Sequence, residues 1–127
     1  MSCIKSYTVY MSPFGEHVRA AREALRRRER RFSLRQVALR IGVEPAYLSK
    51  VERGEVAPPS EATIRRLAQD LGEDPDLLLA LAGKVSADLQ EVIRHRPQLF
   101  ARLIRALKDA PDHALLRIVR EVREGDW

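Results

Sequence analysis

Residues 33–54 read SLRQVALRIGVEPAYLSKVERG, and this stretch predicts two short helices joined by a tight turn. On the first helix, Val37, Ala38 and Ile41 place apolar side chains at i, i+1 and i+4, which makes one inward stripe. Gly42 follows where the chain must turn, and glycine adopts the left-handed backbone of such a turn without steric cost.

The second helix of this pair has its own buried pattern. Leu48 and Val51 form an inward i, i+3 pair, and the outer face is mostly small or polar. Pro45 suits the first turn, because the N–H group that proline lacks has no helical partner there. The two helices together predict a helix-turn-helix.

The rest of the chain also follows helical spacing, which predicts an all-α fold. We expect a helix from Phe14 to about Arg28 and another from Asp76 to about Ala82. Between them, Ser60 is the expected cap of a helix whose apolar stripe comprises Ala62, Ile64, Leu67, Ala68 and Leu71.

These patterns divide the chain into three parts. Residues 13–83 are expected to form a five-helix domain that contains the helix-turn-helix, and residues 84–127 a helical C-terminal extension. Residues 1–12 form an N-terminal extension, for which we expect either disorder or a short strand that pairs with a partner chain.

Positive charge is concentrated around the helix-turn-helix. The chain carries a formal net charge of +5. Residues 19–53 alone hold eleven Lys and Arg against four Glu, a net +7. This distribution favours the phosphate backbone of a nucleic acid as partner.

Several classes of protein are not expected. The one cysteine, Cys3, provides no disulfide and fits a reducing, cytoplasmic environment. The sequence contains no apolar run long enough to span a membrane and no signal peptide pattern. His17, His95 and His113 are scattered, so we expect no metal site, and the absence of a nucleophile–base motif or phosphate loop predicts no enzyme and no cofactor.

Residues 14–82 resemble the Cro/phage-repressor superfamily, the xenobiotic-response-element type of bacterial regulator. The resemblance rests on Ala38, Gly42, the run Leu48-Ser49 and Val51-Glu52-Arg53-Gly54, a following proline, and the helix from Ile64 to Leu71. It implies a sequence-specific DNA-binding transcription regulator that acts as a dimeric repressor on double-stranded DNA. The third helix of this family, here residues 44–53, would enter the major groove.

The resemblance assigns base contacts to the outer face of that helix: Ala46, Tyr47, Ser49 and Lys50. Lys50 can donate to a guanine, and Ala46 can contact a thymine methyl group. Where the family often has glutamine, this chain has Leu34 and Pro45, so we expect few direct base contacts.

Phosphate contacts are expected from residues flanking the helix pair: Ser33, Arg35, Arg40, Arg53, and Arg28 and Arg31 of the basic run 26–31. The arginine run could equally be a solvated helix end. Glu55 lies where family members often have a basic residue. Within the domain, the resemblance implies a structural ion pair between Arg22 and Glu52.

The C-terminal helices carry a wide apolar face made of Leu99, Phe100, Leu103, Ile104 and Leu107. We expect this face to mediate homodimerisation; the alternative is that it packs back on the first domain. Two other functions stay open: an antitoxin that regulates its own operon and binds a toxin through the helical tail, and a module that bridges other proteins.

Overall fold

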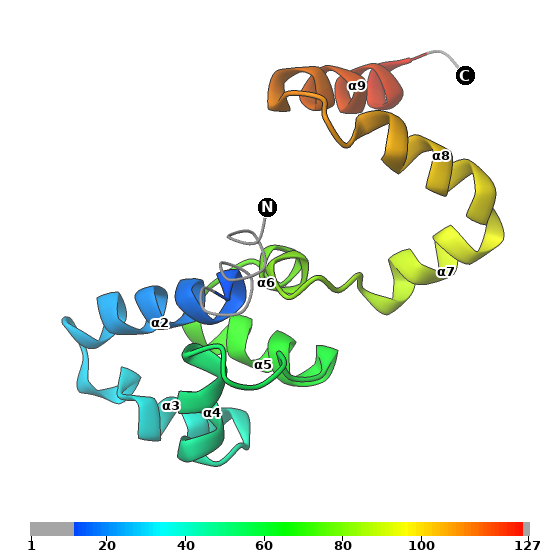
Figure 1. Cartoon of the computed structure of the whole chain (residues 1–127). Coiled ribbons are helices and arrows are strands. Elements are labelled where there is room, and N and C mark those ends of the chain that lie inside the picture. The colour runs from blue at the N-terminus through cyan, green and yellow to red at the C-terminus, as the bar shows by residue number, and fades with distance from the viewer. Residues whose placement is uncertain (1–11, 126–127) are drawn as a thin grey trace, which may run out of the picture. The chain divides into compact units, whose positions relative to one another are not determined.

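The computed structural model describes residues 12–125, and the expected N-terminal extension lies outside them except for Ser12. The chain divides into two compact units between Ser86 and Ala87. The described part contains only helices, so the predicted all-α fold is confirmed (Figure 1). The first unit comprises α2 (Pro13–Arg26), the 3-10 helix η1 (Arg30–Phe32), α3 (Leu34–Ile41), α4 (Pro45–Glu52), α5 (Glu61–Leu71) and α6 (Pro75–Leu81).

Serine side chains begin three of these helices. The hydroxyl groups of Ser12, Ser33 and Ser60 accept hydrogen bonds from backbone N–H groups in the first turns of α2, α3 and α5. Each bond satisfies a donor that has no partner inside its helix. These caps place the helix starts close to where the sequence pattern puts them.

One apolar core joins the helices of the first unit. α3 packs against α4 and α5, while α2 packs against α4. The buried apolar side chains are Phe14, Val18, Phe32, Val37, Ala38, Ile41, Leu48, Val51, Ile64, Leu67, Ala68, Leu71, Leu78 and Leu79. The inward stripes expected on α3 and α4 therefore form the centre of this core.

One expected core position on α5 is wrong. Ala62 is exposed, and the neighbouring Thr63 is buried instead. Thr63 starts a regular i, i+1, i+4, i+5, i+8 stripe with Ile64, and its hydroxyl group hydrogen-bonds the capping Ser60. The cap thus satisfies the polar atom of a threonine whose methyl group can remain in the core.

α2 approaches the end of α4 very closely at Gly15. A Cβ atom at this position would lie 2.7 Å from the carbonyl oxygen of Glu52 and nearer still to that of Val51. Glycine is therefore required here by contact between two backbones, which fixes how α2 crosses α4.

The second unit comprises α7 (Ala87–His95), α8 (Pro97–Leu107) and α9 (Asp112–Glu124). α7 packs against α8. No described residue of these three helices is buried, although each helix has a distinct apolar side. In the described residues 12–125, no helix has the length and apolarity needed to cross a bilayer.

Candidate nucleic-acid interface

The turn between α3 and α4 has the conformation that the sequence predicted. Gly42 ends α3 with a φ of 80°, in the left-handed region. The next N–H group, of Val43, donates to the Ala38 carbonyl oxygen at 3.0 Å, and α4 starts two residues later at Pro45. The short turn holds α4 across α3, as a helix-turn-helix requires.

The outward face of α4 consists of Ala46, Ser49, Lys50 and Arg53, which are spaced i, i+3, i+4 and i+7 and so share one side of the helix. Ala46, Lys50 and Arg53 are exposed, and Ser49 is half-buried. Tyr47, which was also expected to contact a base, is half-buried and packs against the core. Three of the four expected base-contact residues thus lie on the open face.

Hydrogen bonds already join some of these side chains to one another. The Arg53 guanidinium donates to the Ser49 hydroxyl oxygen at 2.7 Å and is also paired with the Glu55 carboxylate. Both members of the Arg53–Glu55 pair are about half exposed, with side-chain exposures of 50% and 51%. No ion pair is formed by Lys50 in the described residues.

A buried ion pair supports this face from behind. Arg22 of α2 donates to both carboxylate oxygens of Glu52, at 2.7 and 3.0 Å, and also to the Phe32 carbonyl oxygen at 3.3 Å. The two side chains are only 5% and 3% exposed. This is the pairing that the family resemblance implied, and it fixes the orientation of α4 on α2.

The residues expected to contact phosphates lie in different environments. Arg28 and Arg35 are exposed, while Ser33 is half-buried and caps α3. Arg31 pairs with Glu29 and stacks on the Phe32 ring, its guanidinium carbon 4.8 Å from the ring centroid. These four residues lie just before the start of α3 or in its first turn.

Arg40 has partners that the sequence did not indicate. Its guanidinium donates to both Asp70 carboxylate oxygens, at 2.6 and 3.0 Å, and lies over the Phe32 ring. The hydrogen bond to Asp70 is the main cause that raises the pKa of Arg40. Asp70 is 30 residues away in the chain, so no local spacing could have identified it.

The apolar face expected to mediate dimerisation is open in the second unit. Leu99, Leu103 and Ile104 are 60%, 47% and 58% exposed, and Phe100 and Leu107 are half-buried. Exposed apolar area of this kind typically marks a site of interaction.

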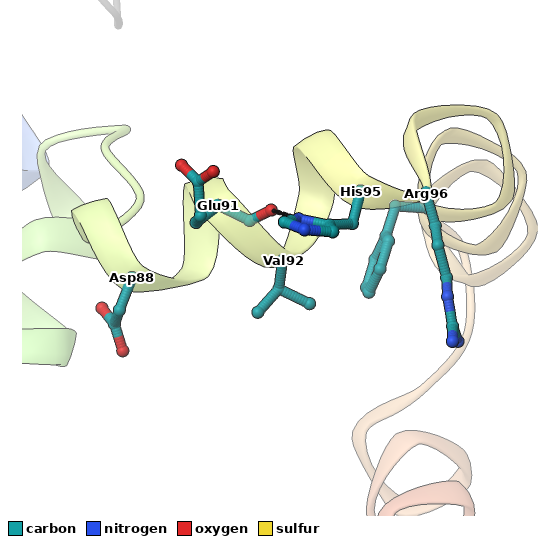
Figure 2. Close-up of a pocket in the computed structure, with 6 residues that line it drawn as sticks. Asp88, Glu91, Val92, His95 and Arg96 are labelled. Carbon is teal, nitrogen blue, oxygen red and sulfur yellow. Dashed lines mark hydrogen bonds between the residues drawn. The ribbon is translucent and has the colours of Figure 1, made fainter.

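A pocket opens beside this face where α7 meets α8, lined by Asp88, Glu91, Val92, His95, Arg96 and Phe100. Figure 2 shows Asp88 and Val92 projecting from one side of α7 and Glu91 from the other. The ring of His95 is hydrogen-bonded to the Glu91 carbonyl oxygen at 2.8 Å. The pocket has a mixed rim of acidic and basic groups around apolar side chains.

Comparison with known proteins identifies the first unit. A family described as "Helix-turn-helix domain" matches residues 13–81. Two Bacillus subtilis (strain 168) proteins are similar. "Uncharacterized HTH-type transcriptional regulator RghRB" is 37% identical over 82 residues, which cover 65% of this chain and 55% of that protein. "HTH-type transcriptional repressor RghR" is 37% identical over 75 residues, which cover 59% and 52%.

The chain thus spans about half the length of the curated relatives it matches, 55% and 52%. No solved structure matches the chain significantly.

Proposed function

The chain belongs to the helix-turn-helix domain family, and on that basis we propose that it is a sequence-specific DNA-binding regulator of transcription of the Cro/phage-repressor type. α4 enters the major groove, and Lys50, Ser49 and Ala46 contact bases there. The observation that carries this proposal is the outward face of α4, on which exposed small and basic side chains recur at helical spacing.

The charge of the first unit supports the same function. Its excess of arginine surrounds the helix pair, and Arg28 and Arg35 are exposed. Contacts of this kind hold a protein on the DNA backbone without reading sequence. Leu34 and Pro45 donate no side-chain hydrogen bonds, so sequence preference rests on few direct contacts and on DNA shape.

We propose further that the protein binds as a dimer and represses by occluding its site. A single recognition helix covers too few base pairs for useful discrimination, and proteins of this kind generally pair on two half-sites. The exposed apolar face of α8 supports self-association through the second unit. Repression is supported by the printed name of one relative, a transcriptional repressor.

Selection of bound fragments from a random DNA pool tests this function. The full-length protein is expected to enrich two inverted half-sites whose centres lie about 34–36 Å apart, one turn of the double helix. Affinity for the enriched fragments is expected to fall steeply as salt rises. If no sequence is enriched and binding does not depend on salt, DNA recognition is contradicted. Enrichment of a single, unpaired half-site would contradict the dimer.

A further inference from the structure

The acidic residue that follows α4 is held against the proposed DNA-binding face. Gly54 has a φ of 75° and reverses the chain, and the Glu55 N–H group donates to the Lys50 carbonyl oxygen at 2.9 Å. This bond fixes the Glu55 backbone beside the last turn of α4. The Glu55 carboxylate then pairs with the Arg53 guanidinium.

Arg53 has two partners within the chain, which accept from different nitrogens of its guanidinium group. The Glu55 carboxylate binds Nε, and the Ser49 hydroxyl oxygen accepts from a terminal nitrogen. A DNA phosphate offers Arg53 the same chemistry as Glu55, an anionic oxygen acceptor. Glu55 and a phosphate are therefore alternative ligands of one guanidinium.

The surroundings of Arg53 leave its guanidinium group accessible to solvent, and a hollow lies beside it. It measures about 130 Å³ and is lined by Arg53, Ser49 and Leu34 together with the charged side chains of Arg19, Arg22, Glu23 and Glu52. Because the Arg53–Glu55 pair is half exposed, water screens it and the guanidinium can be released at small cost.

We propose that Glu55 is an internal counter-ion that competes with DNA phosphates for Arg53 and so limits the affinity of the protein for DNA. The competition is the same on every DNA sequence, because the phosphate is the same. Glu55 therefore sets affinity and salt dependence, while Lys50 and Ser49 set sequence preference. This inference rests on the proposed DNA-binding function.

Glu55→Gln tests the proposal, because it removes the charge and keeps the size of the side chain. The full-length variant is expected to bind a selected fragment and random DNA more tightly by the same factor, about two- to five-fold, the range that exposed ion pairs give. The slope of log affinity against log salt is expected to steepen by up to about one, for one additional phosphate contact.

Two further variants make the result specific to Arg53. Glu121→Gln makes the same change of net charge in α9, where Glu121 pairs with Arg117 at 3.8 Å, and it is expected to leave DNA affinity unchanged. In an Arg53→Ala background, Glu55→Gln is expected to give no gain.

A gain from Glu55→Gln no larger than that from Glu121→Gln would overturn the proposal, and so would a gain that persists without Arg53. Absence of salt-dependent DNA binding by the unmodified protein would instead overturn the proposed function itself.

Discussion

Glu52→Gln is expected to destabilise the first unit severely. The substitution keeps the shape of the side chain but leaves the Arg22 guanidinium, 5% exposed, without its counter-charge. The hydrogen bonds at 2.7 and 3.0 Å lose their anionic acceptor, because the glutamine amide keeps one neutral oxygen that can accept and turns its NH2 group, a second donor, toward the guanidinium. Breaking a buried pair in this way costs about 3–5 kcal/mol, a large part of the roughly 5–15 kcal/mol that holds a typical domain together.

Two other variants show whether the loss of stability comes from leaving a buried charge unpaired. Glu23→Gln removes the partner of Arg19 on the same helix, an exposed pair at 3.3 Å, and is expected to cost less than about 1 kcal/mol. The double variant Arg22→Met/Glu52→Leu leaves no buried charge. Its main loss is the bond to the Phe32 carbonyl oxygen, so we expect it to cost about 1–3 kcal/mol, less than Glu52→Gln alone.

Native-state amide hydrogen exchange of the buried amides of α2 and α4 measures these free energies of unfolding in the first unit alone. Tryptophan fluorescence is unsuitable, because the single tryptophan, Trp127, is not among the residues of the first unit. The reasoning is refuted if Glu52→Gln costs no more than Glu23→Gln, or if the double variant is less stable than Glu52→Gln.

Three further predictions concern packing and assembly. Gly15→Ala is expected to lower the free energy of unfolding by about 1–3 kcal/mol, because its Cβ atom would press against two carbonyl oxygens of α4. An unchanged urea midpoint would show that the close approach is absent. Gly42→Ala is expected to lower the free energy of unfolding by about 1–2 kcal/mol through its left-handed backbone alone, since no atom lies within 4 Å of the added Cβ. Equal stability of the variant in urea would argue against the left-handed turn. Leu103→Glu in α8 is expected to convert a sedimenting dimer to monomer, whereas Leu77→Glu in α6, similarly exposed, leaves it dimeric; a dimer that survives Leu103→Glu contradicts pairing through α8.

Much of the first unit could be predicted because its determinants are local. Helix stripes, serine caps and the left-handed position of Gly42 each follow from residues a few positions apart. The error at Ala62 also has a local cause, because alanine counts as apolar in a pattern while Thr63 enters the core with its hydroxyl group bound to Ser60.

The unpredicted features depend on contacts between distant segments. In the sequence, Gly15 is an ordinary residue of a helix, and only its contact with the end of α4 shows why glycine is required there. Asp70, which accepts hydrogen bonds from Arg40, lies 30 positions away in the chain. From the sequence, Arg40 was predicted only to contact a phosphate. The Arg22–Glu52 pair is equally distant, and only the resemblance to a known family pointed to it.

The interface itself was predicted as a set of residues and not as a network. The sequence predicted Ser49 as a base contact and Arg53 as a phosphate contact, yet it did not show that Arg53 binds both Ser49 and Glu55. Side-chain pairing of exposed groups depends on rotamers and on the backbone turn at Gly54, which no periodicity describes.

The central claim is that α4 reads DNA sequence, and the ratio of affinities for a selected fragment and for random DNA tests it most directly. Lys50→Ala is expected to reduce the free-energy difference that corresponds to this ratio by about 1–3 kcal/mol, because it removes a base contact. Arg28→Ala is expected to weaken both affinities alike and to flatten the salt dependence. The ratios of affinities are compared at one fixed salt concentration, and the salt dependence is measured over a series of concentrations. A ratio left unchanged by Lys50→Ala would contradict the assignment of α4 as the helix that recognises the bases.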